Sequence, residues 1–207
     1  MSELWTTIAS ERGALADDLD GLADDRWQTQ SLCTEWTVHD VLAHMASTAD
    51  MSAGKFFAGF AGSGFSFTKF TEKGIADKRG ATPAETVATF RALQHSTKSP
   101  PGPKVSWLGE TVIHAEDIRR PLGIKHTYDS DAVRQVADFY KGSNTLIGAK
   151  NRVAGLRLAA TDADWKNGDG PEVRGPLHSL LMAMTGRGVA CDDLTGEGVG
   201  TLRRRCT

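Results

Sequence analysis

A succession of amphipathic helix patterns in the first 150 residues constrains the fold of this chain more than any other feature. Between Ser2 and about Leu22 the apolar residues recur at steps of three, four or seven, the period of a helix with one buried face. A second helix is predicted to begin at TVHD, where Thr37 caps the first turn and Asp40 answers its free amides. We expect this helix to continue to about Phe60 and to be broken by Gly62 and Gly64.

Two further helices follow from equally clear start and stop signals. In TPAE, Thr82 is a cap, Pro83 occupies the first helical position and Glu85 completes a capping box, which predicts a helix to about residue 97. The turn SPPGP separates it from a helix over about 106–119, which Pro121 and a following glycine stop. Another amphipathic segment covers about 129–146.

The pattern changes after residue 150. The stretch GLRLAATDADW alternates like a short strand, NGDG is typical of a turn, PEVRG is a second candidate strand, and PLHSLLMAMTG resembles a helix that a glycine ends. We therefore predict a mainly α protein: a helical bundle over residues 1–150, followed by a small α/β C-terminal domain over residues 151–207.

Charge and cysteine content exclude several classes of protein. The 24 basic and 26 acidic residues nearly balance, which argues against a nucleic-acid or anionic membrane partner. The first residues are charged and no later run is long enough to span a membrane, so we expect a cytoplasmic protein. Three widely spaced cysteines, Cys33, Cys191 and Cys206, fit neither a disulfide framework nor a four-thiolate zinc site and are expected to be reduced.

The predicted helix over 106–119 carries a polar stripe beside its apolar face. Glu110 and His114 are four residues apart, and Asp117 continues the same stripe. A buried carboxylate beside an imidazole is costly unless it is paired or binds a cation. The spacing alone leaves both a salt bridge and a metal site open.

A histidine of the second predicted helix supplies a possible third metal ligand. His44 follows Asp40 by one turn, and bundle interiors build metal sites from side chains of facing helices. His44, Glu110 and His114 would give two imidazoles and one carboxylate, a set that suits a divalent transition metal and leaves room for water or substrate. Asp40 and Asp117 are then candidate hydrogen-bond partners of the ligating histidines.

Two phrases carry a resemblance to a known family. EWTVHDVLAHM and GETVIHAEDIRRPLG resemble the two helix motifs of the DinB-like superfamily, and specifically its mycothiol-dependent maleylpyruvate isomerase family. The segment after residue 150 is similar to the small C-terminal domain of that branch. The resemblance implies a DinB-like four-helix bundle whose divalent metal, usually zinc, is held by His44, Glu110 and His114.

The same resemblance implies an activity. Such enzymes use mycothiol as a thiol cosubstrate, either to isomerise maleylpyruvate or to transfer the thiol onto another small electrophile. A substrate-carboxylate arginine does not align, and Arg174 and Arg187 are the candidates because a guanidinium binds a carboxylate with two hydrogen bonds. The alternative is a non-catalytic metal-binding protein of the same fold. The oligomeric state is left open.

Three residues near the motifs receive plain interpretations. His39, five residues before His44, is expected on another, exposed face of the helix. Trp36 is expected to pack beside the helix start or line a pocket. Cys33 has no base near it in sequence, and we interpret it as a small buried thiol rather than a nucleophile.

Overall fold

The computed structural model describes residues 2–145 and 147–206, and it divides into two compact units, Met1–Thr127 and Tyr128–Thr207. The division falls earlier than the boundary predicted near residue 150. The reason is that helix α7 (Ser130–Tyr140) packs against helix α9 (Leu177–Met184) of the second unit. A strongly amphipathic helix such as α7 belongs to the unit whose residues cover its apolar face.

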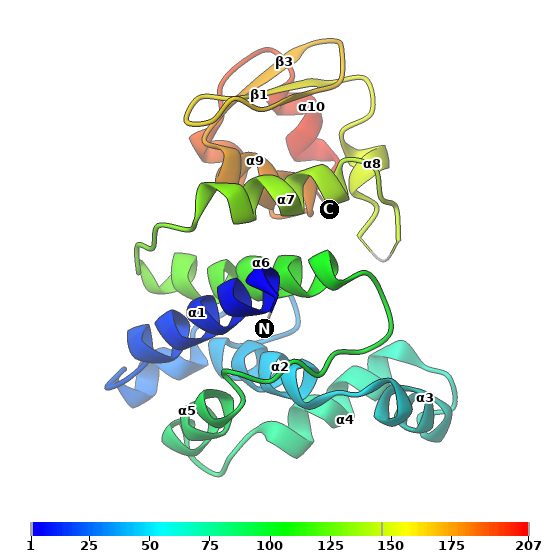
Figure 1. The fold of residues 1–207 in the computed structure, drawn as a ribbon. Helices are drawn as coiled ribbons and strands as arrows, with labels where there is room; N and C mark the ends of the chain where they lie inside the picture. The colour runs from blue at the N-terminus through cyan, green and yellow to red at the C-terminus, as the bar shows by residue number, and fades with distance from the viewer. Residues whose placement is uncertain (1, 146, 207) are drawn as a thin grey trace. The chain divides into compact units, whose positions relative to one another are not determined.

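Four helices of the first unit form the predicted bundle (Figure 1). They are α1 (Glu3–Asp18), α2 (Val38–Asp50), α5 (Pro83–Ala92) and α6 (Lys104–Leu122). Helix α1 packs against α5 and α6, and α2 packs against the same two helices, so the four surround one core. The fold class predicted from the sequence is confirmed.

Apolar side chains from all four helices meet in that core. Ile8 of α1, Leu42 of α2, Phe90 of α5 and Ile118 of α6 have no exposed surface. Each such side chain contributes roughly 1.5–3 kcal/mol when it leaves water, so apolar packing is the main force that holds the bundle together. Within residues 2–145 and 147–206, no helix combines the length and the apolar character needed to cross a membrane.

The helix starts predicted from the sequence are confirmed by their hydrogen bonds. The Thr37 hydroxyl accepts from the Asp40 amide, and the Asp40 carboxylate accepts from the Thr37 amide at 3.0 Å, which is a complete capping box. The Thr82 hydroxyl accepts from the amide of Glu85, with Pro83 in the first turn of α5. Both starts fix where the following side chains point.

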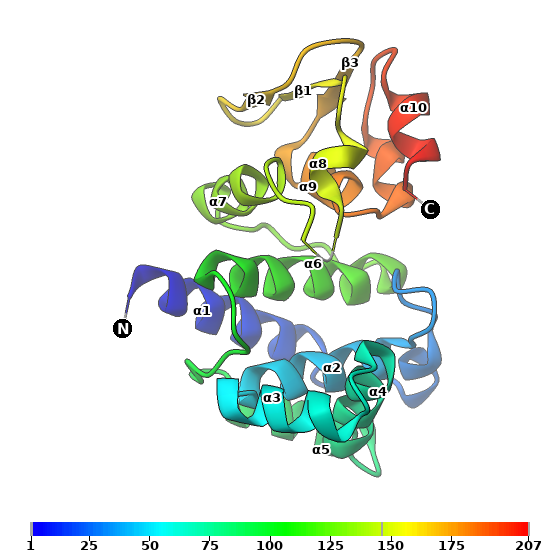
Figure 2. The same cartoon turned by 90° about the vertical axis from the view of Figure 1, so that its right-hand side faces the viewer.

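The second helix is shorter than predicted. It ends at Asp50 instead of about Phe60, because the Ser52 hydroxyl accepts from the Lys55 amide and begins a separate helix, α3 (Ala53–Gly62). A short connection after Gly62 leads into α4 (Phe67–Lys78), which packs against α2 (Figure 2). A short 3-10 helix, η1 (Asp24–Gln28), precedes α2.

Helix α6 runs past the proline that was expected to stop it. Pro121 lies inside the last turn, and the helix ends at Gly123, which has the left-handed φ of 70° that favours glycine. Since proline has no N–H, the carbonyl of Asp117, four residues earlier, lacks its usual helical donor. The amide of Leu32 donates to it instead, at 3.2 Å.

The second unit is the predicted small α/β domain, enlarged by α7. Its three-stranded sheet has the order β2-β1-β3, with β1 antiparallel to β2 and parallel to β3. Helix α9 packs against the sheet and α7, and most of its residues are buried. The remaining elements are α8 (Ala149–Arg152), β1 (Arg157–Ala160), β2 (Lys166–Asn167), β3 (Glu172–Gly175), η2 (Gly188–Asp193) and α10 (Val199–Arg204).

Candidate metal centre

His44, Glu110 and His114 come together where α2 packs against α6. One nitrogen of each imidazole and one oxygen of the carboxylate all lie within 4.8 Å of one another, and the three side chains are half-buried. The two imidazole rings are nearly perpendicular, with centroids 5.0 Å apart. The four-residue spacing on α6 and the capped start of α2 produce this convergence, as the sequence predicted.

Glu110 has a buried carboxylate oxygen that a bound cation would stabilise. Its Oε1 is buried, and no hydrogen-bond donor reaches it from the described residues. Burial raises the pKa of this carboxyl, while the charges of His114 and Arg12 and the hydrogen bonds of Thr48 and Thr111 lower it. A buried carboxylate oxygen without a donor costs about 1–3 kcal/mol, and a bound cation would offset that cost.

The two histidines differ in their charge. Burial, and then the charge of His114, lower the pKa of His44 to about 3, so its imidazole is neutral at pH 7 and keeps a lone pair. Burial also lowers the pKa of His114, but the hydrogen bond to Asp117 and the contact with Cys33 outweigh it and raise that pKa to about 10. His114 is therefore protonated at neutral pH unless a cation displaces the proton.

Asp117 lies beside the imidazole of His114. It is fully buried, and its Oδ2 lies 2.9 Å from Nδ1 of His114. A carboxylate can only accept here, so Nδ1 carries a hydrogen and Nε2 is the nitrogen left for a metal. The pairing fixes both the tautomer and the direction of the ring.

Asp40 differs from its expected role beside a histidine. Its carboxylate accepts from the amide and hydroxyl of Thr37 and forms an ion pair with Arg79. These contacts assign Asp40 to the start of α2. The reason is local, because a carboxylate three residues after a threonine cap is already used by the cap.

The residues of the centre fit a divalent metal. Two imidazoles and a carboxylate are the ligand set of reactive zinc sites, which keep a further position for water or substrate. The partnerless oxygen of Glu110 and the Nε2 of His114 that Asp117 leaves available both match that set. The described residues contain a second group that could hold a metal ion. It consists of Cys33, His114 and Asp117, and it shares His114 with the group formed by His44, Glu110 and His114.

Sequence reasoning missed the surroundings of three residues. Cys33 is half-buried, and its Sγ lies 3.1 Å from Oδ2 of Asp117 and 3.8 Å from Nδ1 of His114. Trp36 packs on His44, with ring centroids 4.8 Å apart. His39 is buried rather than exposed, and its Nε2 lies 2.7 Å from the Thr86 hydroxyl. Only the short sequence distance from Cys33 and Trp36 to the Thr37 cap could have hinted at these placements.

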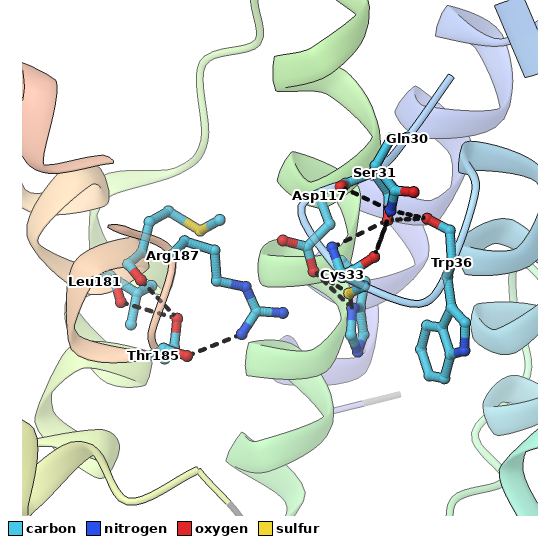
Figure 3. A network of polar contacts seen from close by, with 10 residues as sticks. Gln30, Ser31, Cys33, Trp36, Asp117, Leu181, Thr185 and Arg187 are labelled. Atoms are coloured by element: carbon cyan, nitrogen blue, oxygen red, sulfur yellow. Dashed lines mark hydrogen bonds and ion pairs between the residues drawn. The ribbon is translucent and has the colours of Figure 1, made fainter. Parts of the chain in front are cut away.

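The two arginines proposed for a substrate carboxylate lie in the second unit. Arg174 is exposed on β3, where its backbone pairs with Thr195. Arg187 is half-buried, and its Nη1 donates to the carbonyl of Thr185 at 3.0 Å (Figure 3). Their role toward a substrate stays a prediction.

The fold and the centre together define a helical-bundle protein with a candidate metal site and a small α/β domain. Residues 8–99 match the family model described as the mycothiol maleylpyruvate isomerase N-terminal domain, a range that includes His44 and ends before Glu110. No curated protein matches the sequence.

Two solved structures have the same fold. One is a mycothiol-dependent maleylpyruvate isomerase, with 18% sequence identity and a TM-score of 0.65; the other is a point mutant of such an isomerase, with 16% identity and a TM-score of 0.64. Each match covers 94% of this chain and 92% of the other. The resemblance noted in the sequence is confirmed by the family model over residues 8–99, and the two solved structures show that the fold is shared over most of the chain.

Proposed function

We propose that this chain is a divalent-metal-dependent enzyme that uses mycothiol to isomerise, or to modify by S-transfer, a small electrophilic substrate. Zinc is the metal that its ligand set fits best. The family match and the shared fold support the thiol and the isomerase class. The choice between isomerase and transferase, and the identity of the electrophile, belong to the proposal.

The observation that carries the proposal is the partnerless buried oxygen of Glu110 between two imidazoles. A salt bridge alone would leave this oxygen unsatisfied. His44, neutral at pH 7, offers a lone pair within 4.8 Å of the other two groups, and one divalent cation would bind all three. His44, Glu110 and His114 would hold that cation.

The chain's own residues would then position the reacting groups. When bound, a divalent cation lowers the pKa of a nearby thiol and keeps it as thiolate at neutral pH. Asp117 orients the ring of His114, and Trp36 covers part of the ring of His44. The half-buried setting of the three side chains limits competition from water.

The proposed isomerisation conserves all atoms. The mycothiol thiolate adds to the conjugated double bond of the substrate, and the electron pair of that bond moves onto the neighbouring carbonyl to give an enolate. Rotation occurs about the resulting single bond. The enolate then re-forms the double bond and expels the thiolate, which leaves the trans isomer. In the transferase version, the thiolate is not expelled: the enolate carbon takes up a proton, equivalent to the one that the mycothiol thiol lost on ionisation, and the thioether is the product.

The test begins with the elemental content of the purified protein. We expect near-stoichiometric divalent metal in the wild type and its loss in His44→Ala and Glu110→Ala. His95→Ala, which changes an exposed histidine, is the control and should keep the metal. Calorimetry with mycothiol on the metal-loaded protein should show binding that His44→Ala abolishes, and an absorbance assay with maleylpyruvate tests isomerisation.

Three outcomes distinguish the alternatives. Metal and thiol binding with turnover supports the isomerase. Thiol binding without turnover of maleylpyruvate, but with thioether formation on another electrophile, supports the transferase. Metal binding without thiol binding identifies a non-catalytic metal-binding protein, and a wild type that cannot be loaded with metal refutes the proposal.

A further inference from the structure

Cys33 is a half-buried thiol in direct contact with the group that supports His114. We propose that Cys33 is a positioning residue: it donates to Asp117 and so holds the His114 ring with Nε2 available to a metal. The inference rests on the proposed metal centre and extends it by one residue outside the ligand set.

Three atoms carry the inference. Oδ2 of Asp117 lies 3.1 Å from Sγ of Cys33 and 2.9 Å from Nδ1 of His114, so one oxygen accepts from both side chains. Asp117 has no exposed surface, which means that its carboxylate is oriented by protein donors rather than by solvent. Loss of the thiol donor would let the carboxylate rotate away from His114.

The loop that carries Cys33 is held by internal hydrogen bonds (Figure 3). The side-chain amide of Gln30 donates to the carbonyls of Cys33, at 2.9 Å, and Trp36, at 2.8 Å. The Ser31 hydroxyl accepts from the Cys33 amide at 3.0 Å and donates to the Trp36 carbonyl at 2.7 Å. A loop with this many internal hydrogen bonds holds its side chains in fixed directions.

A backbone hydrogen bond joins the same loop to α6, and the presence of Pro121 leaves its acceptor available. Pro121 leaves the carbonyl of Asp117 without a helical donor, and the amide of Leu32 takes its place at 3.2 Å. Asp117 thus contacts the loop through its backbone and, one residue further along the loop, through its carboxylate. The two contacts fix the register between Cys33 and α6.

The loop also reaches the other histidine. Trp36 packs on His44, and its ring centroid lies 6.4 Å from that of His114. Residues 30–37 therefore contact both imidazoles of the centre from outside the ligand set. This arrangement explains why a cysteine without a helical position of its own lies beside the centre.

The competing role for Cys33 is that of a ligand. Cys33, His114 and Asp117 could hold an ion by themselves, because their donor atoms lie within 4.8 Å of one another. That arrangement would require Nδ1 of His114 to lose its hydrogen bond to Asp117. The positioning role keeps the bond and leaves Glu110 as a ligand.

The experiment is a double-mutant cycle on zinc affinity, measured by competition with a chromophoric chelator. We expect Cys33→Ala to weaken zinc binding roughly tenfold, the lower end of the range for outer hydrogen-bond partners. Cys33→Ser, which keeps a donor, should stay within about threefold of the wild type. In an Asp117→Asn background, Cys33→Ala should change the affinity by less than about twofold, because its effect passes through Asp117.

Cys206→Ala is the matched control, since Cys206 is also a half-buried thiol, and it should leave the affinity unchanged. An equal loss from Cys33→Ala in both backgrounds would overturn the inference. So would a sulfur-to-metal charge-transfer band in the cobalt-loaded wild type without added thiol, which would make Cys33 a ligand.

A readout without metal separates this inference from the proposed function. In the metal-free protein, the Nδ1–H proton of His114 should be visible by NMR and vanish in His114→Ala. It should exchange with water several-fold faster in Cys33→Ala and at the wild-type rate in Cys33→Ser. A wild type that binds no zinc refutes the proposed function. Unchanged exchange of the Nδ1–H proton in Cys33→Ala refutes the positioning role of Cys33. If Cys33→Ala does not fold, loss of the Nδ1–H signal in Cys33→Ser refutes the positioning role instead.

Discussion

Arg12 is a buried cation that acts on the carboxylate of Glu110. It belongs to α1, is 2% exposed, and donates from Nη1 to the carbonyl of Ser96 at 3.0 Å. Burial lowers the pKa of Arg12, and the charge of Glu110 raises it. Because a guanidinium stays protonated in proteins, this positive charge competes with a metal for the same carboxylate.

We therefore expect Arg12→Met to strengthen zinc binding by roughly tenfold, which corresponds to about 1.4 kcal/mol. Competition with a chromophoric chelator measures the change. Arg12→Lys keeps the charge and serves as the control, with an affinity close to the wild type. Weaker binding in Arg12→Met would mean that Arg12 supports the geometry of Glu110 instead of competing for it.

Asp50 links several elements of the first unit at the end of α2. Its carboxylate accepts from Lys55 of α3 at 3.0 Å, from Lys78 of α4 at 2.8 Å and from Lys98, which follows α5, at 2.8 Å. Hydrogen bonds from Lys78 and Lys98, opposed by partial burial and aided by Lys55, hold the pKa of Asp50 well below its usual range. The lysines are partly exposed, so the network is worth about 1 kcal/mol rather than the sum of its pairs.

The sign of the pH dependence follows from the lowered pKa. The stabilising contribution of Asp50 is complete above the unfolded pKa of about 3.9 and is lost as the pH falls toward the folded pKa. We expect Asp50→Asn to lower the free energy of unfolding by about 1 kcal/mol at pH 7, a difference that shrinks below pH 4. Urea unfolding at several pH values checks this, and a difference that grows on acidification would contradict it.

The attachment of the Cys33 loop to α6 depends on a missing backbone donor. Pro121→Ala restores an N–H that can donate to the Asp117 carbonyl within the helix, in competition with the Leu32 amide. We expect the Leu32 amide to exchange with solvent faster in this variant, by about tenfold. Pro83→Ala is the control, since a first-turn amide has no helical acceptor. Unchanged exchange at Leu32 would show that the loop holds itself in place.

At the scale of the whole molecule, the sequence predicted those features of the fold and the candidate site that depend on local periodicity. The spacing of Glu110 and His114 and the cap at Thr37 fix side-chain directions within single helices, and two packed helices then suffice to bring in His44. The place of Cys33 could not be predicted, because it depends on hydrogen bonds within a loop and on a contact with a helix more than eighty residues away.

Two further differences have the same origin. His39 is buried against Thr86 of α5 and Trp27 of η1, which no pattern within α2 reveals. The boundary near residue 150 was placed by a change in sequence pattern, whereas the partner of α7 decides to which unit it belongs. In both cases long-range packing, not local propensity, determines the outcome.

Chelation tests whether the bundle depends on the proposed metal. The core is apolar and complete without the three ligands, so a metal that binds only the folded state adds stability by mass action, about 2.7 kcal/mol at a free concentration of 100 times Kd. We expect a chelator to lower the melting temperature by roughly 5–10 °C without changing the far-UV circular dichroism at 25 °C. His114→Ala should melt at a temperature that zinc does not alter, while His95→Ala should respond as the wild type does. Loss of helical signal on chelation would instead identify the metal as a structural element, because a bundle that needs its ion to fold has ligands that replace part of the core.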